Sequence, residues 1–115
     1  MLDDSDHIAR RPTVIAGQTY ADDFGVIWHG LPIGRIMKAT GLPPHLPQWR
    51  WNINVPGKPG SASGSGADLD YCEAALKAVW AVIRASLTEA NIVHAHETAK
   101  ASTDALARYQ QRRPV

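Results

Sequence analysis

The chain has 115 residues, of which 44% are hydrophobic and 20% charged, and its formal net charge is +1. This length fits one domain with a modest core, and the composition excludes disordered and fibrous proteins. A net charge this close to zero gives no general attraction for nucleic acid or an anionic membrane. The single cysteine, Cys72, excludes an internal disulfide.

The N-terminal segment is polar and acidic, then reads Arg10-Arg11-Pro12 without any periodicity. We expect residues 1–12 to form a flexible arm. They lack the basic start and apolar run of a signal peptide, and the longest apolar run, residues 78–83, is too short to cross a bilayer. We therefore expect a cytoplasmic protein without membrane contacts.

Residues 13–55 carry the pattern of an antiparallel sheet. Residues 23–28 and 33–38 read as two strands joined by turn residues, which predicts a hairpin. Residues 48–55 alternate strictly between apolar and polar side chains, which predicts a third strand. Residues 13–16 are a short β-rich run before a glycine, and whether they pair as a fourth, edge strand stays open.

The strand predicted at residues 48–55 divides into two faces. One face carries Trp49, Trp51, Ile53 and Val55, and the other carries Gln48, Arg50, Asn52 and Asn54. A strict period of two indicates one buried and one exposed face. We therefore predict that Trp49 and Trp51 belong to the core, together with Trp28 and Trp80.

The C-terminal half predicts a loop and two helices. Residues 56–66 read PGKPGSASGSG, which predicts a flexible loop with room for one more short edge strand. Apolar residues recur at three- and four-residue steps over residues 68–87, which predicts a helix that covers one face of the sheet. A second helix, with a thin alanine stripe, is predicted over residues 89–109 behind the N-cap Thr88. Residues 110–115 form a tail.

These elements together predict a single α+β domain over residues 13–109. Its sheet has three antiparallel strands, or four if residues 13–16 pair. Because helix 89–109 has little apolar surface of its own, we expect it to dock on another element. That element is either helix 68–87 of the same chain or a second subunit in a homodimer with two-fold symmetry.

The candidate binding face is the polar side of the sheet, within the segment 31–66, which holds four basic residues and no acid. Arginine and amide side chains bind phosphates, carboxylates or base edges. The candidate residues are Arg35, Lys38, Gln48, Arg50, Asn52 and Asn54. The alternative is that this side is simply solvated, as outer faces of antiparallel sheets usually are.

Motifs for catalysis or metal binding are not found in the sequence. His94 and His96 lie two residues apart, about 200° around a helix, so they cannot share a metal ion. Cys72 lies on the apolar stripe of helix 68–87, which predicts a buried thiol. The glycines of residues 57–66 lack the Lys-Ser/Thr ending of a phosphate-binding loop. We expect neither an enzyme activity nor a metal or other cofactor.

Two motifs of the predicted sheet stand out together, Trp28-x-Gly30-x-x-Ile33-Gly34-Arg35-Ile36-Met37 and Trp49-x-Trp51-x-Ile53. Through them, residues 24–87 resemble a family of small uncharacterised bacterial proteins. The family has no assigned activity, so the resemblance implies no catalytic residues. The order of three strands and a helix is also similar to HicB-like antitoxins, at the level of the fold alone.

The sequence therefore favours a small non-catalytic binding or regulatory module. The alternative is a nucleic-acid-associated protein that uses the basic segment 31–66, with bases stacked on its tryptophans.

Overall fold

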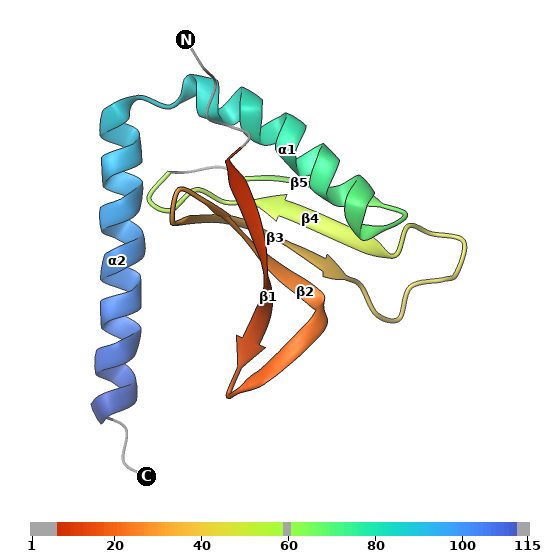
Figure 1. The fold of residues 1–115 in the computed structure, drawn as a ribbon, viewed down its shortest axis with the longest axis horizontal. Coiled ribbons are helices and arrows are strands. Elements are labelled where there is room, and N and C mark those ends of the chain that lie inside the picture. The colour runs from red at the N-terminus through yellow and green to blue at the C-terminus, as the bar shows by residue number, and fades with distance from the viewer. Residues whose placement is uncertain (1–6, 59–60, 113–115) are drawn as a thin grey trace.

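The computed structural model describes residues 7–58 and 61–112. A five-stranded antiparallel sheet precedes two helices, and the strands lie in the sheet in chain order (Figure 1). The elements are β1 (Ile8–Ile15), β2 (Gln18–Trp28), β3 (Leu31–Lys38), β4 (Trp49–Ile53), β5 (Ala62–Gly66), α1 (Leu69–Ser86) and α2 (Glu89–Arg112). The predicted α+β class is confirmed, but the sheet is larger than the three or four strands expected.

The first strand begins earlier than the sequence suggested. Residues 8–12, which we assigned to a flexible arm, pair with β2 between Phe24 and Trp28, whereas residues 1–6 lie outside the described residues. Pro12 is compatible with β1 because an edge strand leaves one side of its backbone unpaired. The turn at Ala16 and Gly17 has φ of 51° and 81°, which suits the tight hairpins that sheet twist favours.

Strands β2 and β3 form the predicted antiparallel hairpin, but with a shorter turn. The turn residues are His29 and Gly30, with φ of 47° and 77°. Strand β3 therefore begins at Leu31 rather than Ile33, because two residues in the left-handed conformation suffice to reverse the chain.

Strand β5 lies in the segment 56–66, which we predicted as a flexible loop; residues 59 and 60 lie outside the description. Its glycines make room for neighbouring side chains. A Cβ on Gly64 would come within 2.6 Å of the Trp51 indole nitrogen, and one on Gly66 within 2.2 Å of the Tyr71 ring. The small residues thus belong to the packing, since large side chains of adjacent elements lie across them.

The core lies between the sheet and α1. Its largest fully buried side chains are Trp80, Leu31, Ile33, Ile36, Ile53, Leu76, Val26 and Cys72. Trp51 is 7% exposed, whereas Arg50 and Asn52 are exposed, so the predicted register of β4 is confirmed. Trp49, at the start of the strand, is half-buried.

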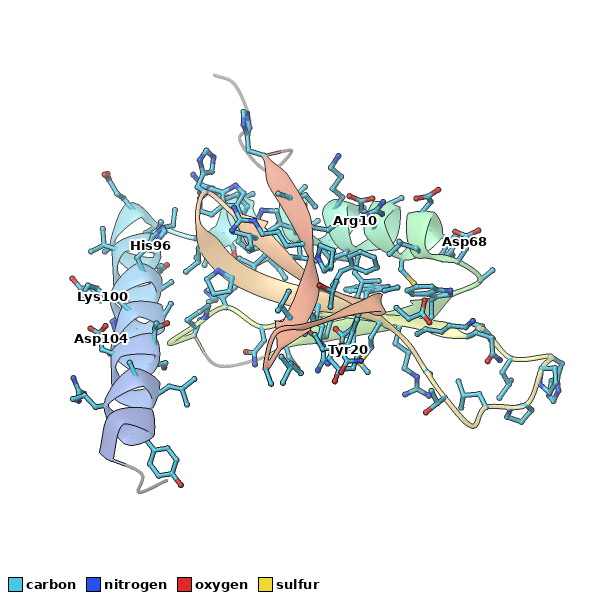
Figure 2. The ribbon with its side chains drawn as sticks, turned by 60° about the horizontal axis from the view of Figure 1, so that its bottom comes forward. Arg10, Tyr20, Asp68, His96, Lys100 and Asp104 are labelled. Atoms are coloured by element: carbon cyan, nitrogen blue, oxygen red, sulfur yellow. The ribbon has the colours of Figure 1, made fainter. Side chains whose placement is uncertain are left out.

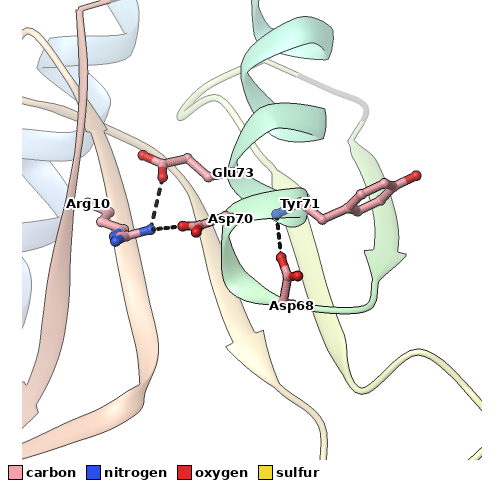
Figure 3. A network of polar contacts seen from close by, with 5 residues as sticks. All are labelled: Arg10, Asp68, Asp70, Tyr71 and Glu73. Atoms are coloured by element: carbon pink, nitrogen blue, oxygen red, sulfur yellow. Dashed lines mark hydrogen bonds and ion pairs between the residues drawn. The ribbon is translucent and has the colours of Figure 1, made fainter.

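Helix α1 coincides with the helix predicted over residues 68–87. It begins where the Asp68 carboxylate accepts a hydrogen bond of 2.8 Å from the Tyr71 N–H, as Figure 3 shows. On one side of the helix, Arg10 of β1 donates to Glu73 at 2.9 Å and lies 3.6 Å from Asp70. These contacts tie one side of α1 to β1, while the helix itself packs on β3, β4 and β5.

Helix α2 is capped as predicted, by reciprocal hydrogen bonds between Thr88 and Asn91. Its first half packs mainly against β3 rather than along α1, and Ala95 is buried there. Its second half extends away from the sheet, with Leu106 and Tyr109 exposed (Figure 1). Within the chain, α2 therefore docks on the sheet instead of on α1, and its docking on a second subunit stays a prediction.

The outer part of α2 is stabilised within the helix itself. Lys100 lies 3.0 Å from Asp104 one turn later, and Figure 2 shows both on the same stretch of helix. Such a pair contributes a few tenths of a kcal/mol, about 0.3 to 0.5. Over the residues described, neither helix combines the length and apolar character required to cross a membrane.

Candidate binding face

The side of the sheet opposite α1 is called the open face here. Its central positions follow from the strand register, in which Arg35 pairs with Asn52 and Asn52 with Ser63. The next row joins Met37, Arg50 and Ser65. Because cross-strand partners point to the same side, these six residues share one surface.

The structure brings three of the six predicted residues onto this surface: Arg35, Arg50 and Asn52. Lys38 lies in the row of Trp49 and therefore on the side that faces α1. The reason is alternation itself, since residues 35 and 38 of one strand must point to opposite sides.

The other two predicted residues lie beyond the ends of β4. The Gln48 amide donates hydrogen bonds to the carbonyls of Pro43 and Leu46, at 2.9 and 2.8 Å. Gln48 therefore shapes the loop between β3 and β4 instead of facing a ligand. Asn54 is exposed, and its backbone N–H continues the ladder by donating to the Ile33 carbonyl at 2.7 Å.

The sequence analysis missed Arg11, Ser63 and Ser65. Arg11 pairs with Gly25, which pairs with Arg35, so Arg11 belongs to the same row of the open face. It was missed because residues 1–12 were assigned to an arm, and the serines because residues 56–66 were assigned to a loop. The two-residue turn at Ala16 and Gly17 was the available signal for β1.

Arg35 is held by an acid on its own face. Its Nε donates to the Asp23 carboxylate at 2.7 Å, and a second guanidinium nitrogen contacts the other carboxylate oxygen. Thr13 Oγ1 donates to the same carboxylate at 3.0 Å. Hydrogen bonding from Arg35 lowers the pKa of Asp23 despite the opposing effect of burial, and Asp23 in turn raises the pKa of Arg35. Arg35 thus joins β3 to the first hairpin and is already neutralised.

Arg50 lies in a groove of about 550 Å³ on the open face. One wall is aliphatic and comes from β3 and the following loop, with Met37, Leu42, Leu46 and Pro47. The remaining lining residues are Arg50, Trp51, Asn52, Ser63, Gly64 and Ser65. Within residues 7–58 and 61–112, Arg50 has no ion-pair or hydrogen-bond partner. An unpaired guanidinium beside an aliphatic wall suits a ligand with an anionic and an apolar part.

The tryptophans contribute little to the open face, although the edge of the 7% exposed Trp51 borders the groove. Trp28, Trp51 and Trp80 are buried in the core, and the half-buried Trp49 packs against that core. The stacking platform on which the nucleic-acid alternative relied is therefore not formed by these side chains.

In the part of the chain that the structure describes, no three His, Cys, Asp or Glu side chains gather as a metal site. Cys72 is buried as predicted, and burial, with a smaller contribution from Asp68, raises the pKa of its thiol. The thiol is thus protonated at neutral pH and unreactive.

Comparison of the chain with models of protein families, with curated proteins and with solved structures finds no match. The resemblance drawn from residues 24–87 therefore stays a prediction. The function has to be argued from the geometry of the open face.

Proposed function

We propose that this chain is a non-catalytic binding module whose open face holds an acidic segment of a partner protein. The observation that carries the proposal is the unpaired Arg50 in a groove with an aliphatic wall and polar neighbours. A guanidinium binds a carboxylate through two parallel N–H donors. The wall of Leu42, Leu46 and Pro47 would take an apolar side chain next to that carboxylate, while Asn52 and Ser63 offer hydrogen bonds to its backbone.

Nucleic acid is the second candidate ligand. Arg11 and Arg50 have no ion-pair partner among residues 7–58 and 61–112, so both supply positive charge on the open face. Phosphates bind guanidinium groups as well as carboxylates do. We favour the polypeptide because the groove wall is aliphatic, whereas single-stranded nucleic acids stack their bases on aromatic side chains.

A titration of the ¹⁵N-labelled chain would test the proposal. The probes are a synthetic peptide of alternating leucine and glutamate and, separately, mixed-sequence single- and double-stranded DNA, each at several salt concentrations. We expect the peptide to shift the amide signals of residues 50–52 and 63–65. Arg50→Gln should weaken its binding by about tenfold or more, because a charge-assisted hydrogen bond pair is lost.

Arg108→Gln is the matched control, since Arg108 is exposed on α2 and outside the open face. It should leave peptide binding unchanged. Peptide affinity that does not respond to Arg50→Gln would contradict the proposal. DNA binding with a steep salt dependence, without any response to the peptide, would establish the second candidate instead.

A further inference from the structure

Helix α1 has three different sides around its axis. One side is buried on the sheet through Cys72, Leu76 and Trp80. A second side carries the charged residues Asp70, Glu73, Lys77 and Arg84, which the 3.6-residue period places together. The third side carries no charge and consists of Tyr71, Ala74, Ala75, Ala78, Val82 and Ala85.

This uncharged side of α1 is open to solvent over β5. Tyr71 is 60% exposed and Val82 is 72% exposed. Figure 3 shows Tyr71 pointing away from Arg10, Asp70 and Glu73, on the opposite side of the helix. The Tyr71 ring lies against Gly66, the last residue of β5. The uncharged side therefore looks out over the β5 edge of the sheet.

Strand β5 presents free backbone groups at this edge. The Asn54 N–H donates to the Ile33 carbonyl, and the Ala39 N–H donates to the Gln48 carbonyl. The backbone groups of even-numbered residues in β4 therefore form hydrogen bonds with β3. By alternation, those of odd-numbered residues form hydrogen bonds with β5. Their partners are Ala62, Gly64 and Gly66. The N–H and C=O groups of Ser63 and Ser65 consequently point away from the sheet.

The two edges of the sheet are protected differently. Strand β1 carries Arg10, Arg11 and Pro12 and a register shift after Pro12, which are features that discourage pairing with another chain. Strand β5 reads Ala-Ser-Gly-Ser-Gly, with no charge, no proline and no register shift against β4. The unprotected edge thus coincides with the uncharged side of α1.

We propose that these two surfaces bind a second copy of this chain. Strand β5 pairs antiparallel with the partner's β5, and α1 packs antiparallel on the partner's α1 across one two-fold axis. Such an axis places this side of α1 against the same side of the partner's α1, so a contact side without charge avoids like-charge repulsion. The small residues Ala74, Ala78 and Ala85 allow the helices to approach within the usual spacing of roughly 8–10 Å.

The shape of the surface is also self-complementary. A groove of about 280 Å³ lies between the start of β5 and the C-terminal half of α1, where Val79, Ile83 and Ser86 line it. In an antiparallel helix pair, the N-terminal half of the partner's α1 lies next to this groove. The exposed Tyr71 of each copy would therefore fill the groove of the other.

The proposed contact extends along α1 and the edge of β5. Helix α1 has 18 residues, so it is about 27 Å long. A strip of that length, together with the strand edge beside it, is of the order of the roughly 800 Å² per partner that specific interfaces bury. The two sheets would join into one, with both Arg50 grooves on the same side. The dimer does not depend on the ligand proposed for those grooves.

Sedimentation equilibrium of the full chain across the micromolar range tests the dimer. Val82→Glu should raise the dissociation constant by about tenfold or more, because each copy would bury an unpaired carboxylate against the uncharged side of the partner's α1. Val93→Glu is the matched control: Val93 is also exposed, on α2, and its replacement should change nothing. Ser65→Pro should weaken the dimer as well, because it removes an outward N–H and leaves the bonds to β4 intact.

Far-UV circular dichroism shows whether each variant is folded. If Val82→Glu does not fold, Ala78→Cys replaces it, since a cysteine near the axis should give a covalent dimer on mild oxidation while the buried Cys72 does not react. A chain that is monomeric throughout the micromolar range, or the absence of this cross-link, would overturn the proposal. So would a dimer that resists Val82→Glu and dissociates with Leu106→Glu, because the contact would then lie on α2.

Discussion

The covered face of the sheet and its open face are formed by alternate residues of the same strands. In β4, the buried Trp51 is followed directly by the exposed Asn52. The covered face consists of aromatic and aliphatic side chains under α1, whereas the open face holds arginine, amide and hydroxyl groups. This difference separates stability from recognition: changes on the covered face should lower the free energy of unfolding, and changes on the open face should mainly affect binding.

The largest expected effect contrasts neighbours in β4. Trp51→Ala should lower the free energy of unfolding by roughly 3–5 kcal/mol, because a large buried side chain leaves a cavity. Asn52→Ala, on the open face, should change it by no more than about 0.5 kcal/mol. Urea denaturation followed by tryptophan fluorescence measures both. A similar decrease in the free energy of unfolding for the two variants would contradict the assignment of stability to the covered face.

A second contrast concerns glycines on the two faces. Gly66→Ala should destabilise the fold by roughly 1–3 kcal/mol, because its Cβ would collide with the Tyr71 ring and approach Cys72 Sγ to 3.1 Å. Gly25→Ala is the control, since no atom lies within 4 Å of the added Cβ. In thermal unfolding, the midpoint temperature of Gly25→Ala should be close to that of the unchanged chain. An equal loss for both would show that backbone freedom, rather than packing on β5, makes these glycines necessary.

The smallest effect concerns the ion pair between Asp23 and Arg35 on the open face. Asp23→Asn should cost about 1 kcal/mol or less at neutral pH, because the Arg35 side chain is 47% exposed and solvent screens the pair. The folded-state pKa of Asp23 is lowered from 3.8. Its contribution is therefore fully present above that value and is lost as the pH falls through the lower, folded-state pKa.

Urea denaturation of both proteins as a function of pH measures this contribution. The two stability curves should be separated at neutral pH and converge in acid, as the pH falls below the lowered pKa of Asp23. A separation that stays constant down to the most acidic conditions would mean that the carboxylate charge of Asp23 is not what stabilises the fold.

Strong local periodicity made part of this structure predictable. The alternation of residues 48–55 gave the register of β4, the burial of Trp51 and the exposure of Arg50 and Asn52. The three- and four-residue spacing of residues 68–87 located α1 to within a residue at each end. Strand β1 was left open as a short edge strand at residues 13–16, and β5 only as an alternative within a flexible loop, because proline, arginine, glycine and serine have little β-propensity of their own.

What the sequence by itself determined is therefore the set of features that depend on neighbours along the chain: the class of the fold, the faces of β4 and the buried stripe of α1. Only the tertiary structure decided which charged side chains of the open face remain available to bind a ligand. It pairs Arg35 with Asp23, leaves the Arg50 side chain without a partner among the described residues, in a groove between two distant segments, and adds Arg11 to the open face. Strand pairing brings together residues far apart in sequence, and neutralisation of a charge depends on distance in space rather than on spacing along the chain.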